Sequence, residues 1–149
     1  MKKGKGMVGS ETPVRLIVKV PCAVIEHEGK VLAAQRGADL SLPLKWEFPG
    51  GKLEENETEE ECLIREIREE LDVEILIGDR LPLSIRDDGW REIQLVPFVC
   101  QLLTFDIKLI DHEEIRWLAP DELSNLDWAE ADYVVISSYL EYLENQQKA

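Results

Sequence analysis

The chain has 149 residues, of which 31 are acidic and 17 basic, and its formal net charge at pH 7 is −14. Such an acidic balance argues against binding to long nucleic acid, which rewards basic patches that release counterions. No run of residues approaches the roughly 18 consecutive apolar side chains that a membrane-spanning helix needs.

Residues 1–12 carry three lysines, three glycines and little apolar content, so we expect a flexible N-terminal arm. A chain of this length is typical of one domain with its own core, which we place at residues 13–149. Runs of β-branched and aliphatic residues predict the first two strands near residues 16–25 and 30–35.

A helix is predicted from Thr58 to Leu71. Thr58 and Glu61 have the spacing of a capping box, in which the hydroxyl and the carboxylate each pair with a free amide of the first turn. Leu63, Ile67 and Leu71 recur at i, i+4 and i+8. They form an apolar stripe that can dock on a core.

The same helix carries a stripe of carboxylates. Glu66, Glu69 and Glu70 lie at i, i+3 and i+4, so they share one face, and we expect no basic side chain between them. Two unit charges 4 Å apart repel by about 4 kcal/mol at the effective dielectric of a protein surface. Oxygen ligands suit Mg²⁺ or Mn²⁺, and Mg²⁺ also takes substrate phosphates as ligands. The stripe therefore predicts a magnesium site for a phosphate-bearing substrate, where a solvated surface helix would interleave lysines.

Further elements are expected beyond this helix: strands near residues 74–84, 92–103 and 115–118, a short helix at 121–126 and a final helix at 131–144. Pro97 predicts a bulge or an edge in its strand, because proline cannot donate to a β ladder. The order of elements indicates an α+β fold, a mixed β-sheet between helices.

The three cysteines, Cys22, Cys62 and Cys100, are odd in number and far apart. They lack the CxxC or Cys/His spacing of a zinc site and argue against a disulfide framework. We therefore expect a cytoplasmic protein in a reducing environment.

The segment from Gly51 to Val73, directly after Trp46–Gly50, resembles the box of the Nudix hydrolase family, GX5EX7REUXEEXGU, in which U is aliphatic. Asp72 is the one departure, since the family usually has glycine there. Aspartate adopts the left-handed conformation less easily than glycine, so we expect a small stability cost and no lost chemistry. The resemblance covers nearly the whole domain and implies the Nudix α/β/α sandwich.

The resemblance also implies roles within the box. Glu57 would sit on an adjacent metal or its waters. By its spacing alone, one residue from Glu66 and four from Glu69, the guanidinium of Arg65 could orient a ligand carboxylate. The implied metal ligands are Gly50 through its carbonyl, Glu66, Glu69 and Glu70.

The run Trp46–Lys52 is similar to the MutT-like branch, which cleaves nucleoside triphosphates to the monophosphate and pyrophosphate, by attack on the β-phosphorus. This branch implies phosphate contacts from Arg36, which closes a strand, and from Lys52, which follows the glycines. A polyanion in so acidic a site needs such cationic partners. The alternative for each is a solvent-facing charge.

The loop before Trp117 carries the candidate general base. Asp111 matches the family position best by its distance from Trp117, and Glu113 and Glu114 are alternatives, as is a charged turn without chemistry. His112 is a candidate proton shuttle at neutral pH.

Asp132 matches the position at which MutT-like enzymes read the nucleobase edge. A carboxylate accepts from the exocyclic amine of cytosine or guanine, and a protonated one donates to a carbonyl. The alternative is helix capping by Asp132 or Asp127. Further candidates for substrate contact are Phe48 and Arg91. Trp90 and Trp128 are candidates for stacking on a base, and the alternative for each is a place in the core or an interface.

We expect a Mg²⁺-dependent hydrolase of (deoxy)nucleoside triphosphates, with Mn²⁺ as a substitute ion. An oxidised purine nucleotide such as 8-oxo-dGTP and a cytosine-type nucleotide are both candidate substrates. The alternatives are a Nudix hydrolase of ADP-ribose, nucleotide sugars or dinucleotides, and a non-catalytic nucleotide sensor, against which the intact carboxylate set argues. We expect a small-molecule nucleotide as partner, no long nucleic acid, no membrane, and a monomer or homodimer.

Overall fold

The strands of residues 16–148, the part of the chain that the computed structural model describes, form one mixed sheet. The strand order is β4-β3-β2-β7-β5, with β6 also paired to β7 and β8 also paired to β3. Among these pairs, β2 and β7 run parallel and the others antiparallel. The strands are β2 (Leu16–His27), β3 (Lys30–Gln35), β4 (Trp46–Glu47), β5 (Ile75–Arg80), β6 (Ser84–Asp87), β7 (Arg91–Leu102) and β8 (Glu114–Leu118).

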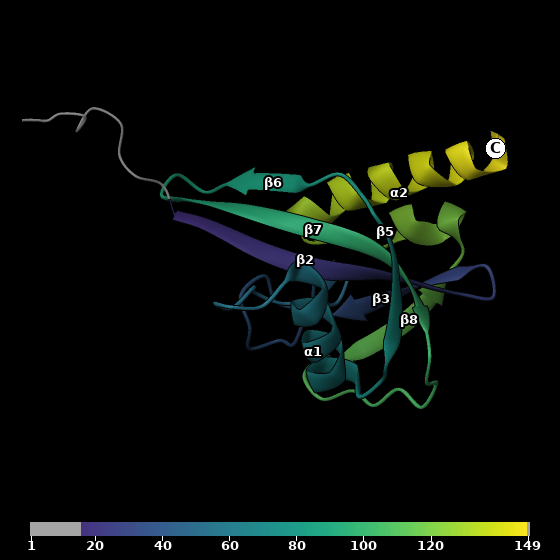
Figure 1. Ribbon diagram of the computed structural model, residues 1–149, viewed down its shortest axis with the longest axis horizontal. Helices are drawn as coiled ribbons and strands as arrows, with labels where there is room; N and C mark the ends of the chain where they lie inside the picture. The colour runs from purple at the N-terminus through teal and green to yellow at the C-terminus, as the bar shows by residue number, and fades with distance from the viewer. Residues whose placement is uncertain (1–15, 149) are drawn as a thin grey trace, which may run out of the picture.

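Helices cover both faces of this sheet. Figure 1 shows α1 (Glu59–Leu71) on one side of β2 and β7 and α2 (Glu130–Lys148) on the other, with the 3₁₀ helix η1 (Pro120–Asn125) leading into α2. The predicted α+β fold, a mixed sheet between helices, is confirmed. The expected arm at residues 1–12 lies outside the described residues.

Strand β2 is the centre of the core because both of its faces are buried. Cys22 and Val24 belong to the apolar cluster beneath α2, whereas Ala23 and Ile25 belong to the cluster beneath α1. This alternation is the period of two that a β-strand imposes on its side chains. A parallel strand covered by helices on both sides reads as a continuous apolar run, as this segment does.

Helix α1 forms as its sequence predicts. Glu61 N donates to Thr58 Oγ1 at 3.0 Å and Thr58 N donates to Glu61 Oε1 at 2.9 Å, which completes the capping box. Leu63, Ile67 and Leu71 are fully buried. Beyond the helix, Asp72 adopts the left-handed conformation at φ 56° and ψ 39°, in the place where the family usually has glycine.

Two expectations about strands are corrected. The single strand expected at residues 74–84 is two strands, β5 and β6, which are separated at Pro82. Pro97 does not lie in an edge strand, because β7 pairs on both of its sides. Its carbonyl accepts a hydrogen bond from Leu81 N at 2.8 Å, so its missing N–H faces the irregular link between β5 and β6. The expected irregularity is present as a register shift between Ile77 and Arg80.

The smaller elements also differ from expectation. Strand β4, only two residues long, is too short to be read from periodicity. The final helix reaches Lys148 instead of ending at residue 144, and the expected short helix is of the 3₁₀ type. No helix within residues 16–148 combines the length and apolar character needed to span a bilayer.

Candidate active site

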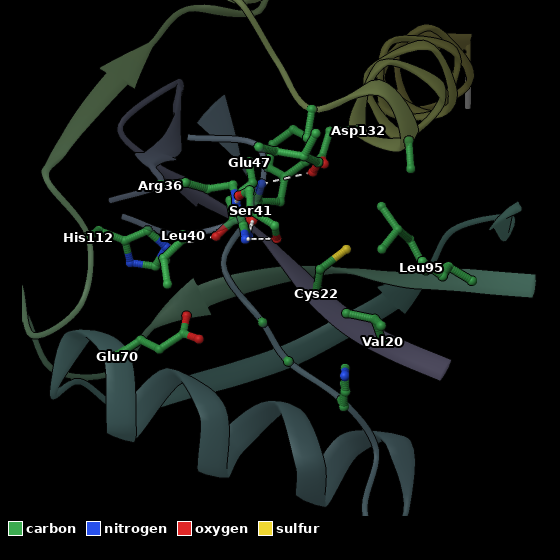
Figure 2. Close-up of a pocket in the computed structure, with 18 of the residues that line it drawn as sticks. Val20, Cys22, Arg36, Leu40, Ser41, Glu47, Glu70, Leu95, His112 and Asp132 are labelled. Atoms are coloured by element: carbon green, nitrogen blue, oxygen red, sulfur yellow. Dashed lines mark hydrogen bonds and ion pairs between the residues drawn. The ribbon is translucent and has the colours of Figure 1, made fainter. Parts of the chain in front are cut away.

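A cavity of about 960 Å³ lies beside the parallel strands, between the C-terminal end of α1 and the start of α2. Val20 and Cys22 of β2 and Leu95 of β7 form its apolar floor. Glu70 points toward it from α1, and Asp132 lies on the side of α2 (Figure 2). The cavity therefore has an acidic end at α1 and a second polar end at α2.

The turn at Gly50 and Gly51 is packed so tightly that neither position has room for a side chain. A Cβ on Gly50 would lie 2.1 Å from the carbonyl oxygen of Pro21, and one on Gly51 would lie 2.2 Å from Cδ of Glu66. Gly51 N donates to Pro21 O at 3.2 Å, which holds the turn on β2. The two glycines thus bring the turn directly against a carboxylate of α1.

The three expected metal ligands of α1 differ in exposure. The side chain of Glu66 is 16% exposed, against 57% for Glu69. Glu70 lines the cavity, and its Oε1 is buried without a hydrogen-bond partner among residues 16–148. Burial, followed by the negative charges of Glu47 and Glu66, raises the pKa of Glu70 to about 9. Glu66 and Glu70 therefore converge, while Glu69 is turned outward.

Arg65 lies among these carboxylates. Its Nη1 donates to Glu66 Oε2 at 2.9 Å and to Glu69 Oε1 at 3.3 Å, and Nη2 donates to Glu57 Oε1 at 2.7 Å. The hydrogen bonds from Arg65, followed by the amide of Glu54, lower the pKa of Glu57 to about 2. The expectation of no basic side chain between the carboxylates is wrong, because a long side chain one residue away reaches along the helix surface to them.

The two expected phosphate contacts both line the cavity. Arg36 is held by Ser41, whose backbone oxygen accepts from Nε at 2.7 Å and whose hydroxyl accepts from Nη2 at 3.1 Å. Its Nη1 donates to Glu47 Oε1 at 2.8 Å. A guanidinium has five N–H donors, so two have no partner within residues 16–148 and could bind a ligand. Lys52 is exposed at the rim.

Of the candidate bases in the loop before β8, Asp111 and His112 line the cavity. Asp111 is exposed, whereas the side chain of His112 is 5% exposed. Glu113 and Glu114 lie outside the cavity lining, and Glu114 Oε2 accepts from Arg116 Nε at 2.9 Å. The structure therefore favours Asp111 over the two glutamates by position.

Asp132 lies at the α2 end of the cavity, where its side chain contacts the backbone of Phe48. Its Oδ1 accepts from Phe48 N at 2.9 Å. Burial, with a smaller contribution from the charge of Glu47, raises the pKa of Asp132 to about 8. The side chain does not cap α2, and Asp127 instead pairs with Lys45 at 2.8 Å.

Trp128 belongs to the core, which was the alternative to stacking on a base. Trp128 is 1% exposed, its Nε1 donates to Leu123 O at 2.7 Å, and its ring centroid lies 4.8 Å from that of Phe48. It packs behind Phe48, the residue that faces the cavity. Trp90 is 63% exposed and outside the cavity lining, with the guanidinium of Arg91 4.8 Å above its ring.

Comparison with known proteins identifies the family. A family model described as "NUDIX domain" matches residues 15–139. The chain belongs to the Nudix family. Over 124 residues it is 32% identical to CTP pyrophosphohydrolase of Escherichia coli (strain K12), a match that covers 83% of this chain and 92% of the relative.

A second Nudix relative is the putative 8-oxo-dGTP diphosphatase 2 of Mycobacterium tuberculosis (strain H37Rv), 36% identical over 105 residues, with 68% of this chain and 73% of the relative covered. Among solved structures, MutT of methicillin-resistant Staphylococcus aureus 252 is 40% identical with a TM-score of 0.69, covering 83% of this chain and 95% of that one. The predicted Nudix and MutT-like membership is confirmed, and the chain is a Nudix hydrolase.

Nudix hydrolases generally use divalent metal ions, and the donor set of this chain fits one. The buried Oε1 of Glu70 has no partner in the described part of the chain, and Glu66 crowds it with a second negative charge. A hard cation with oxygen ligands would remove both costs. Within residues 16–148 no three acidic, histidine or cysteine side chains form a preformed cluster, so a bound ion would have to draw the carboxylates together.

Two cavity residues outside the Nudix box were absent from the sequence candidates. Glu47 accepts hydrogen bonds from Arg36 and pairs with His112, and Arg86 lies 3.0 Å from Glu130 through its Nε. Glu47 follows the buried Trp46 and so faces away from it, but a two-residue strand is too short for that alternation to be recognised. No local signal marks Arg86.

Proposed function

We propose that this Nudix hydrolase cleaves (deoxy)nucleoside triphosphates, with Mg²⁺, to the monophosphate and pyrophosphate. The proposal rests on the chemical difference between the two ends of the cavity. Glu70 and Lys52 line one end, and Phe48 with the buried Asp132 lines the other. A nucleotide has the same two ends, a polyphosphate that needs cations and a planar base with a polar edge.

We assign the steps as follows. A metal held by Glu66, Glu69, Glu70 and the Gly50 carbonyl would offset the charge of the polyphosphate and acidify water. Lys52 and the two free N–H groups of Arg36 bind phosphate oxygens and orient the chain for attack. Asp111 at the rim takes the proton of the attacking water.

At the other end, Phe48 provides an apolar surface for the base and Asp132 reads its edge. With a pKa of about 8, Asp132 is mostly protonated at pH 7 and has one donor and an acceptor. Such a group can pair with the amine of cytosine or with a carbonyl of 8-oxoguanine. The relatives named for CTP and for 8-oxo-dGTP support these two nucleotide classes.

A turnover panel with product analysis tests the proposal. CTP, dCTP, 8-oxo-dGTP, the remaining triphosphates, ADP-ribose, a nucleotide sugar and a dinucleotide are each incubated with Mg²⁺. Release of pyrophosphate from a triphosphate is expected. Turnover of ADP-ribose without triphosphate turnover would move the enzyme to another Nudix branch, and no turnover with Mg²⁺ or Mn²⁺ would favour a sensor.

Variants of the box supply the control within that panel. Glu69→Gln is expected to lower turnover by orders of magnitude while the fold survives, whereas Glu60→Gln, on the exposed first turn of α1, keeps it. Wild-type rates in Glu69→Gln would contradict the ligand assignment. We place the activity in the cytoplasm, where the free and buried thiols of the chain stay reduced.

A further inference from the structure

A line of hydrogen bonds joins the two loops that flank the cavity (Figure 2). Ser41, in the loop after β3, accepts from Arg36, and Arg36 Nη1 donates to Glu47 Oε1 at 2.8 Å. His112 Nε2 lies 2.9 Å from the other oxygen, Glu47 Oε2. Each oxygen of Glu47 therefore faces one partner, and the two partners come from separate loops, one after β3 and one before β8.

Burial determines which ring nitrogen of His112 carries the proton. Its side chain is 5% exposed, and Nδ1 is buried without a hydrogen-bond partner among residues 16–148. A proton on Nδ1 would leave a buried donor unpaired, which is unfavourable. A proton on Nε2 is instead donated to the carboxylate of Glu47. The geometry thus favours the Nε2–H tautomer, with His112 as a donor.

Glu47 needs such donors because of its acidic surroundings. Its charge raises the pKa of both Glu70 and Asp132, so all three carboxyl groups lie close enough to interact. A carboxylate among other carboxylates is held only where donors satisfy it. Arg36 and His112 supply these donors, and in doing so they fix Glu47 between them.

Asp111, the neighbour of His112, is exposed at the rim of the cavity. Its loop is tied to the sheet by Glu113 N, which donates to Gln35 O at 2.9 Å, and by the side chain of His112. We propose that His112 and Glu47 are a positioning pair. They hold Asp111 over the cavity in a fixed position relative to Arg36. This inference rests on the proposed function, in which Asp111 takes the proton of water and Arg36 binds phosphate.

Steady-state kinetics of His112 variants test the pair, with CTP as substrate or with 8-oxo-dGTP if CTP is not turned over. His112→Ala is expected to lower kcat by about 10-fold to 100-fold, the usual loss for an outer-shell partner, with a smaller change in KM. His112→Gln, whose amide can donate to Glu47 from a similar position, should recover most of the loss. Equal losses in both variants would overturn the proposal.

A double variant separates positioning from a general loss of structure. If His112 acts through Asp111, His112→Ala in an Asp111→Asn background should lower kcat by less than about twofold, because the base that it positions is already gone. A loss equal to the product of the two single losses would overturn the proposal. His27, the last residue of β2, is the other histidine of the chain. His27→Gln is therefore the matched control and should keep wild-type kinetics.

Nitrogen-15 spectra of the imidazole rings give a readout that needs no turnover. The chain has two histidines, so His27→Gln assigns the signals. The Nε2–H tautomer of His112, lost in Glu47→Ala, is the expected result, and a proton on Nδ1 would overturn the proposal. If the wild type hydrolyses no nucleotide, the proposed function fails, while these spectra still decide whether the pair exists.

Discussion

Glu70 has a buried side chain whose hydrogen-bonding capacity the fold does not fully use. One of its oxygens finds no partner within residues 16–148, and burial with two neighbouring negative charges raises its pKa to about 9. Such groups are typical of functional sites, where a ligand removes the penalty. The residue therefore links metal binding to stability.

Glu70→Gln keeps the shape of the side chain and removes its charge. In EDTA above about pH 9, where Glu70 of the wild type is ionised, this variant is expected to need more urea to unfold than the wild type, because the neutral amide lacks the repulsion from Glu47 and Glu66. Mg²⁺ at 100 times its Kd should add about 2.7 kcal/mol to the wild-type free energy of unfolding and much less to Glu70→Gln. Glu60→Gln is the control, and equal Mg²⁺ stabilisation of all three proteins would show that the ion binds elsewhere.

Asp132 predicts a pH dependence of stability. Its pKa is about 8 in the folded state and about 3.9 in the unfolded state, so between these values the native state binds more protons. The free energy of unfolding therefore falls as pH rises through this window, by at most about 1.4 kcal/mol per pH unit for one group.

Asp132→Asn removes this contribution and should have a flatter profile of urea unfolding between about pH 5 and pH 9. The exposed Asp121→Asn is the control and should follow the wild type. Glu70 adds a slope of the same sign in every one of these proteins, so only the difference between profiles reports Asp132. Parallel profiles for the wild type and Asp132→Asn would contradict the assignment.

At the scale of elements, the turn before α1 is shaped by two different neighbours. Gly50 faces the backbone of β2, which cannot move without breaking the sheet, whereas Gly51 faces the end of the flexible side chain of Glu66. The same added methyl group therefore has different consequences at adjacent positions.

Gly50→Ala should lower the free energy of unfolding by about 2 kcal/mol or more, since its Cβ overlaps backbone atoms. Gly51→Ala should lower stability less but reduce turnover by at least about 10-fold, because Glu66 has to swing away from its place as a ligand. Urea unfolding and steady-state kinetics on both variants check this. Equal stability losses with unchanged turnover in Gly51→Ala would contradict the packing argument.

At the scale of the whole molecule, the net charge of −14 works against compactness, since like charges repel one another more strongly in the folded state. The acidic side chains are spread over the surface as well as the cavity. Salt screens repulsion between exposed charges beyond roughly 10 Å at 0.1 M. Ionic strength therefore acts on the molecule independently of the metal site.

Raising KCl from about 0.05 M to 0.5 M in EDTA is expected to increase the urea midpoint. A variant with Glu141→Lys and Glu144→Lys on the exposed face of α2 changes the net charge from −14 to −10, and its salt response should be smaller. An unchanged or larger response would show that surface repulsion is not the cause.

Local patterns in the sequence were sufficient for helix α1. Its capping box, its apolar stripe and its left-handed end at Asp72 all involve residues within a few positions of one another, and the physics of a helix acts over that range. Strand β4 was not expected, and β5 and β6 were expected as one strand without the break at Pro82. Short strands are defined by their partners and not by their own sequence pattern.

The sequence alone determined the family and the acidic helix, since each is encoded in neighbouring residues, and it determined the mixed sheet between helices through the order of its elements. Only the tertiary structure decided that Trp128 packs behind Phe48 and that Glu47 lies between Arg36 and His112. The contacts His112–Glu47 and Phe48–Asp132 join residues 65 and 84 positions apart. Such pairs form only when the register of the sheet brings distant segments together, and no local periodicity encodes that register.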